Sequence, residues 1–103
     1  MVNLDLEKNI QSKKLFERAK QALPGGVNSP VRAFAPNPFF VTHANGSKIF
    51  DVDNQEYIDY CMAYGALFLG HSHPQVLKSV QDQLVKGTLY GTPTEIEVKL
   101  AEK

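Results

Sequence analysis

The sequence lacks the features that mark several common classes of protein. Cys61 is the single cysteine among 103 residues, so no disulfide can form within the chain, and no histidine or cysteine near it has the spacing of a zinc site. Eleven basic residues balance eleven acidic ones, so no cationic field attracts nucleic acid or anionic lipid. We therefore expect a protein of the reducing cytoplasm with neither nucleic acid nor membrane among its partners.

The sequence also has no long hydrophobic run. Residues 1–9 mix Asp5, Glu7 and Lys8 with isolated leucines, which matches neither a secretory signal nor an Arg-rich transit peptide. A bilayer span needs about 20 consecutive apolar residues. We therefore expect neither a targeting segment nor a transmembrane helix.

What is present is a series of short helical and β patterns. Apolar residues at helical spacing predict an amphipathic helix over residues 12–23, which the Pro24-Gly25-Gly26 run then ends. Residues 24–38 are rich in proline yet keep several apolar side chains, and we expect them to form an ordered loop. Three β-prone segments separated by turn signals follow, and they predict a small antiparallel meander: 39–42, 48–52 and 56–60, with turns at Asn45-Gly46 and Asp53-Asn54.

Two helices are expected in the last third of the chain. Pro74 suits the first turn of a helix that ends at Gly87, with an apolar stripe along one face. The Thr92-Pro93-Thr94-Glu95 run has the capping-box pattern, which predicts a further helix from about Pro93. That pattern continues to Lys103 without a C-cap signal, so we expect the chain to be part of a longer one.

The proline-rich loop contains a candidate anion site. Arg32 is flanked by apolar residues, and its guanidinium could bind a carboxylate in a bidentate manner while the hydroxyl of Ser29 adds a third hydrogen bond. The alternative is a solvated arginine that only ties down the loop. Gly25-Gly26 follows a helix and does not precede one, which favours a helix C-cap over a phosphate cradle.

Histidine and tyrosine give weaker signals. His71-Ser72-His73 suits a turn and a helix cap better than a zinc site, because two residues do not place both imidazoles on one helical face. Tyr57 and Tyr60 are expected to pack across strands, whereas Tyr64 and Tyr90 lie in glycine-flanked loops where they could line a pocket. No hydrolytic Ser/His/Asp or Cys/His arrangement is readable.

Several longer motifs carry a family resemblance. The run from Leu15 through Gly25-Gly26-Val27-Asn28-Ser29-Pro30-Val31-Arg32 resembles the opening of the glutamate-1-semialdehyde 2,1-aminomutases, members of the class-III pyridoxal phosphate (PLP)-dependent aminotransferases. The resemblance continues through Glu56-Tyr57-Ile58-Asp59-Tyr60, Gly70-His71-Ser72-His73-Pro74 and Gly91-Thr92-Pro93-Thr94-Glu95.

The resemblance implies an α/β fold, the N-terminal part of a fold-type I PLP-dependent transferase: a helix, a long loop, a small antiparallel meander and two helices. Residues 1–70 would belong to the small domain and residues 71–103 to the start of the large domain. It also implies a cytoplasmic homodimeric isomerase of tetrapyrrole (porphyrin) biosynthesis, which converts glutamate-1-semialdehyde to 5-aminolevulinate through the pyridoxal and pyridoxamine forms of the cofactor.

The resemblance also assigns roles to individual residues. Ser29, Arg32 and Tyr64 match substrate-binding positions, although Tyr64 stands where many members have tryptophan. Leu89, Tyr90 and Gly91 match a loop that approaches the active site across the dimer interface. No lysine here matches the Schiff-base lysine, so we expect no catalytic residue and no covalent cofactor on this chain, and no activity from it alone.

Two alternatives remain open at this stage. The chain could belong to another class-III aminotransferase, which shares the later motifs in looser form but not the Gly-Gly-Val-Asn-Ser-Pro-Val-Arg loop. It could also be a short non-catalytic interaction module that docks through exposed apolar surface.

Overall fold

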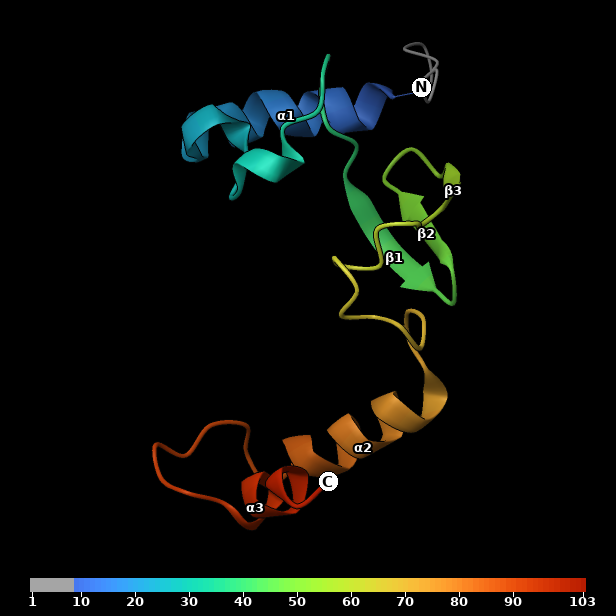
Figure 1. Cartoon of the computed structure of the whole chain (residues 1–103). Coiled ribbons are helices and arrows are strands. Elements are labelled where there is room, and N and C mark those ends of the chain that lie inside the picture. Colours follow the sequence, from blue (N-terminus) through green and yellow to red (C-terminus); the bar gives the residue numbers. More distant parts are fainter. Residues whose placement is uncertain (1–8) are drawn as a thin grey trace. The chain divides into compact units, whose positions relative to one another are not determined.

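The structure is a computed structural model that describes residues 9–103 (Figure 1). It forms two compact units, one that ends at Ser72 and one that begins at His73. The elements in chain order are α1 (Ile10–Ala22), the short 3-10 helices η1 (Pro24–Gly26) and η2 (Pro30–Arg32), β1 (Val41–Asn45), β2 (Lys48–Asp51), β3 (Glu56–Ile58), α2 (Pro74–Leu84) and α3 (Glu95–Ala101). The predicted order of elements is confirmed.

Helix α1 ends where the sequence predicts. The N–H of Leu23 donates to the carbonyl of Ala19 at 2.8 Å, and Pro24 then lacks the N–H that a further turn would need. The prediction that the glycine pair forms the C-cap is wrong by two residues, because the C-cap is Leu23 in extended conformation. Gly25 and Gly26 instead take left-handed φ values of 66° and 74° in the turn that follows.

The three strands form one antiparallel sheet in the order β1-β2-β3. Strand β1 starts at Val41, two residues later than predicted, and an irregularity between Val41 and His43 shifts its register. Asn45 pairs with Lys48, so Gly46 lies in a two-residue hairpin loop with φ 54°. The predicted meander is therefore confirmed, with β2 and β3 shorter than expected.

Polar contacts fix the turn after β2 and join α1 to the residue before β1. The buried Asp51 carboxylate accepts the N–H groups of Asp53 and Gln55 at 2.9 and 2.8 Å and the hydroxyl of Tyr57 at 2.9 Å. The N–H of Phe40 donates to Oγ of the fully buried Ser12 at 3.2 Å. These bonds replace the water that the buried oxygens would otherwise need.

No hydrophobic side chain among residues 9–103 is fully buried, so the apolar core that the chain length allows is not found in this part of the chain. A three-stranded sheet and one helix leave most apolar side chains without a covering layer. Tyr57 stacks on Phe39 with centroids 4.8 Å apart, as expected for a packed residue. The matching prediction for Tyr60 is wrong: it is 90% exposed, because β3 ends at Ile58 and none of the strands in residues 9–103 pairs with Tyr60.

The second unit contains the two predicted helices. Pro74 opens α2 after His73 as N-cap, and the predicted apolar stripe of Val76, Leu77, Val80 and Leu84 remains 44–53% exposed. Helix α3 begins at Glu95, so the predicted start at Pro93 is wrong by two residues. Thr94 takes the N-cap position, and the Glu97 carboxylate accepts its N–H at 3.1 Å and its hydroxyl at 2.7 Å. None of the helices described has both the length and the hydropathy needed to cross a membrane.

Candidate functional site

The loop that carries Ser29 and Arg32 is held by backbone hydrogen bonds. Pro30 fixes φ at the start of η2, where the N–H of Arg32 donates to the carbonyl of Ser29 and the N–H of Ala33 donates to that of Pro30, both at 3.0 Å. Ser29 is half-buried and Arg32 is exposed. The structure therefore places the two residues that the sequence singled out on one tight turn.

The guanidinium of Arg32 has no partner among the residues that the structure describes. Within residues 9–103 it forms no ion pair, hydrogen bond or cation-π contact, whereas several surface cations are paired with a carboxylate, Lys20 with Glu17 and Lys48 with Glu56 among them. An arginine that merely tied down the loop would donate to a loop carbonyl or carboxylate. The N–H donors of the planar guanidinium are instead available to a carboxylate from outside the described chain.

Tyr64 lies in an unusual turn. Met62, Ala63, Tyr64 and Gly65 all have positive φ, at 46°, 51°, 58° and 92°. The N–H groups of Gly65 and Leu67 both donate to the carbonyl of Met62 at 3.1 Å, which makes a short left-handed turn. The side chain of Tyr64 is 76% exposed. Left-handed conformations of non-glycine residues are uncommon, so the sequence signalled this turn only through Gly65.

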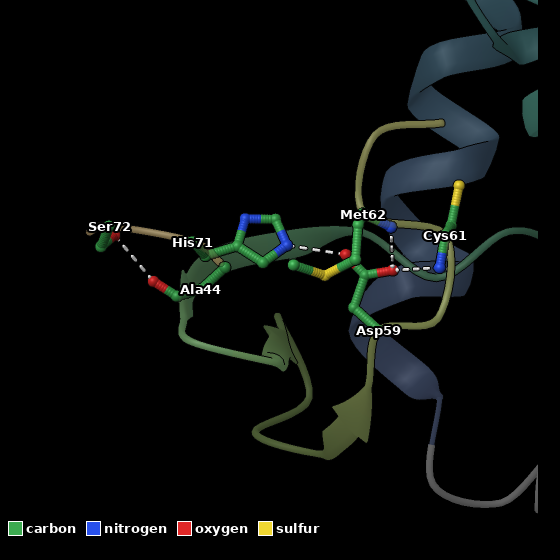
Figure 2. Close-up of polar contacts among 6 residues, drawn as sticks. All are labelled: Ala44, Asp59, Cys61, Met62, His71 and Ser72. Carbon is green, nitrogen blue, oxygen red and sulfur yellow. Dashed lines mark hydrogen bonds and ion pairs between the residues drawn. The ribbon is translucent and has the colours of Figure 1, made fainter. Parts of the chain in front are cut away.

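A hydrogen-bonded pair closes the segment that contains this turn. Nε2 of His71 lies 2.6 Å from Oδ2 of Asp59, and the other carboxylate oxygen accepts the N–H groups of Cys61 and Met62 at 2.9 and 3.0 Å. Figure 2 shows the imidazole and the two N–H groups approaching the carboxylate from opposite sides. Sequence reasoning missed this pair, because twelve residues separate its members and no local pattern joins them.

The electrostatics of the pair follow from its hydrogen bonds. The side chains of His71 and Asp59 are only 18% and 10% exposed. The hydrogen bond from His71, helped by the N–H groups of Met62 and Cys61, lowers the pKa of Asp59 from its ordinary value, while burial opposes this. The carboxylate is therefore ionised at neutral pH, and a protonated or Nε2–H imidazole can donate to it.

The remaining predicted residues lie in the second unit. The hydroxyl of Tyr90 donates to the carbonyls of Lys86 and Gly87 at 2.8 and 3.0 Å. It accepts a hydrogen bond from Nε2 of Gln83 at 3.0 Å, so Tyr90 caps the end of α2. Leu89 is 91% exposed, and Gly91 has φ 64°. Within the first unit, no hydrogen bond or ring contact among the described residues joins Tyr64 to Ser29 or Arg32.

The cofactor that the resemblance implies does not fit the residues described. A Schiff-base lysine is held in a pocket that desolvates its amine, but every lysine in residues 9–103 is exposed, and four pair with a neighbouring carboxylate: Lys20, Lys48, Lys78 and Lys99. Among the same residues, no three His, Cys, Asp or Glu side chains are placed to hold a metal ion. What this part of the chain offers is a loop with an exposed arginine that has no partner among the described residues, and an exposed aromatic residue on a hydrogen-bonded turn.

The sequence is similar to those of known proteins. The sequence profile of the class-III aminotransferases matches residues 31–103. A glutamate-1-semialdehyde 2,1-aminomutase of Methanosarcina acetivorans is 58% identical over 93 residues, which cover 90% of this chain and 22% of that protein. An enzyme of the same name from Methanococcoides burtonii is 56% identical over 103 residues, or 100% of this chain and 23% of its own length. The chain thus spans about a fifth of the length of these curated relatives.

The fold matches as well. The crystal structure of an omega-transaminase from Sphaerobacter thermophilus superposes with a TM-score of 0.90 at 37% identity, covering 97% of this chain and 23% of that one. The predicted fold class, the N-terminal part of a fold-type I transferase, is therefore confirmed. Because the family profile covers more than two thirds of the sequence, the chain belongs to the class-III aminotransferase family.

Proposed function

We propose that this chain is the N-terminal part of a PLP-dependent glutamate-1-semialdehyde 2,1-aminomutase subunit. The isomerase would convert glutamate-1-semialdehyde to 5-aminolevulinate for tetrapyrrole synthesis. Relatives of that name share 58% and 56% of the aligned residues. The observation that carries the proposal is Arg32, an exposed guanidinium without a partner in the described chain, on a turn that also holds Ser29.

The proposed roles follow from the chemistry of each side chain. The substrate carries a carboxylate that takes no part in the rearrangement, and a fixed charge on that group orients the reacting carbons. The fork of Arg32 would bind both carboxylate oxygens, and the hydroxyl of Ser29 would donate a further hydrogen bond. The exposed ring of Tyr64 would form an apolar wall of the same pocket and exclude water.

The cofactor chemistry belongs to other parts of the subunit in this proposal. PLP supplies an electron sink for amino-group transfer, and the residues described offer it no buried lysine. The chain alone is accordingly proposed to be inactive. Its contribution is to bind and orient the substrate.

Assembly and location are proposed on the same basis. We place the active enzyme in the cytoplasm as a homodimer, with residues 1–70 in the small domain and residues 71–103 at the start of the large domain. The loop Leu89-Tyr90-Gly91 would approach the active site of the partner subunit. Its support is Leu89, an apolar side chain that is 91% exposed.

The test uses the full-length subunit that contains this sequence. Arg32→Ala should raise the KM for glutamate-1-semialdehyde by about 10- to 100-fold, because a charged hydrogen-bonded contact contributes roughly 1.5–3 kcal/mol. Arg32→Lys should recover only part of the loss, since an ammonium keeps the charge without the planar fork. Arg18→Ala is the control, because this exposed arginine on α1 lies outside the proposed site.

The outcome separates the two enzyme hypotheses. If Arg32→Ala leaves KM and kcat for the aminomutase reaction unchanged, the carboxylate role is wrong. If the unmodified full-length enzyme acts on ω-amines and not on glutamate-1-semialdehyde, another class-III aminotransferase is favoured, in keeping with the omega-transaminase likeness.

A further inference from the structure

The left-handed turn at residues 62–65 requires support from outside itself. Each non-glycine residue in this conformation costs roughly 1–2 kcal/mol, and three follow in succession, Met62, Ala63 and Tyr64. Such strain persists only where surrounding contacts hold it, and it concentrates at functional sites.

The turn has few supports of its own. Between Tyr60 and Gly70, every residue is exposed or half-buried, so little apolar burial fixes the segment. Its internal backbone bonds are local, such as Gly70 N–H to the carbonyl of Leu67 at 2.7 Å. Within the described chain, the side-chain hydrogen bonds that reach the segment come from Asp59, to the N–H groups of Cys61 and Met62.

Asp59 is fixed in turn by His71. The imidazole holds Oδ2 at 2.6 Å, which leaves Oδ1 directed at the two N–H groups that open the turn. His71 itself is anchored to the hairpin loop of the sheet, because its backbone exchanges two hydrogen bonds with Gly46 at 2.8 and 2.9 Å. A Cβ at Gly70 would lie 3.2 Å from the carbonyl oxygen of Gly46, so the two segments approach closely here.

We infer that Asp59 and His71 are positioning residues that hold the left-handed turn and thereby fix Tyr64 against the substrate. The inference rests on the proposed function only for the role of Tyr64. The carboxylate of Asp59 joins the start of the turn to His71 at the end of the segment (Figure 2). Residues 60–70 therefore form a closed loop anchored on the sheet. Neither residue needs to touch the substrate.

The experiment is a double-mutant cycle in the full-length enzyme. His71→Ala and Tyr64→Ala should each raise the KM for glutamate-1-semialdehyde by about tenfold, which corresponds to one lost interaction of 1.4 kcal/mol. The KM of the double variant should be no higher than that of Tyr64→Ala, because the effects of two residues that act through one contact do not add. His71→Gln, whose amide N–H can donate to Asp59, should stay within about twofold of the parent.

Two controls address a general loss of structure. Ser72→Ala removes the adjacent hydrogen bond from Oγ of Ser72 to the carbonyl of Ala44, 3.0 Å long, and should leave KM unchanged. If His71→Ala does not fold, Asp59→Asn replaces it, because it keeps the acceptor for Cys61 and Met62 and changes only the group that faces His71. An additive double variant, a His71→Gln enzyme as poor as His71→Ala, or an equal effect of Ser72→Ala would each overturn the inference.

An error in the proposed function would be detected by a different measurement. If the unmodified full-length enzyme does not convert glutamate-1-semialdehyde, the proposed function is wrong, whatever His71 does. Protease cleavage within residues 60–70 then still tests the pair without any substrate. His71→Ala should raise the cleavage rate at least about tenfold, because cleavage follows the population of the open loop, and an unchanged rate would overturn the inference.

Discussion

The carboxylate of Asp53 accepts a hydrogen bond from the backbone N–H of Gln11 at 2.7 Å, across forty-two residues of sequence. Its second oxygen accepts the N–H of Ser12 at 2.9 Å. Asn9 precedes α1 and makes no side-chain capping hydrogen bond. Asp53, from the turn after β2, instead accepts the backbone N–H groups that an N-cap side chain normally satisfies. The helix and the sheet are thereby joined by charge-assisted hydrogen bonds.

Asp53→Ala should therefore loosen the start of α1. Loss of an N-cap interaction costs about 0.5–2 kcal/mol. Hydrogen exchange on the full-length subunit should show faster exchange at Gln11 and Ser12. Asp82→Ala is the matched control, since it removes only an exposed pair with Lys78, and unchanged exchange at Gln11 in Asp53→Ala would contradict the capping role.

Acid should weaken the same contact. Burial raises the pKa of Asp53, but the N–H groups of Gln11 and Ser12 outweigh this, and the net pKa lies below the ordinary value. A carboxyl whose folded pKa is depressed contributes stability that is present above its unfolded pKa, about 3.9, and that is lost as pH falls through the folded pKa. Exchange at Gln11 should rise below about pH 4 relative to the intrinsic rate, and Asp53→Asn should flatten that dependence.

The phenol of Tyr57 should resist ionisation. Burial, followed by its hydrogen bond to Asp51 and the nearby negative charge, raises the pKa of Tyr57 to about 12. Because the folded pKa lies above the unfolded value of about 10, the stabilisation is complete below pH 10 and disappears as pH rises through 12. Ultraviolet titration should show one tyrosine that ionises at high pH, and this step should be absent in Tyr57→Phe. Tyr60→Phe changes an exposed tyrosine and should leave the step in place.

Gly26 should tolerate no side chain. A Cβ there would lie 2.6 Å from Cε2 of Phe16, and its φ of 74° is already unfavourable for other residues. Gly26→Ala should lower the thermal midpoint by several degrees, since overpacking costs about 1–3 kcal/mol in addition to backbone strain. Gly25→Ala is the matched control, because its φ is also positive at 66° but no atom lies within 4 Å of an added Cβ. Equal destabilisation by both changes would show that only φ matters.

Short-range patterns in the sequence were sufficient for most of the fold. Pro24 ended α1, and the Asn45-Gly46 signal placed the hairpin between β1 and β2, because each acts on backbone conformation within a few residues. The start of α3 was misplaced because two threonines two residues apart both suit an N-cap. Only the structure shows that Thr94 pairs with Glu97.

The candidate site also combines features that the sequence predicted with features that only the structure shows. By itself, the sequence determined that Ser29 and Arg32 share one proline-rich loop and that the chain resembles the aminomutases, since both depend on contiguous residues. Only the tertiary structure decided that Arg32 has no partner in the described chain, that Asp59 meets His71, and that Tyr64 occupies a left-handed turn. The physical reason is that a side-chain hydrogen bond depends on distance in space, and chain folding brings together groups between which no local pattern exists.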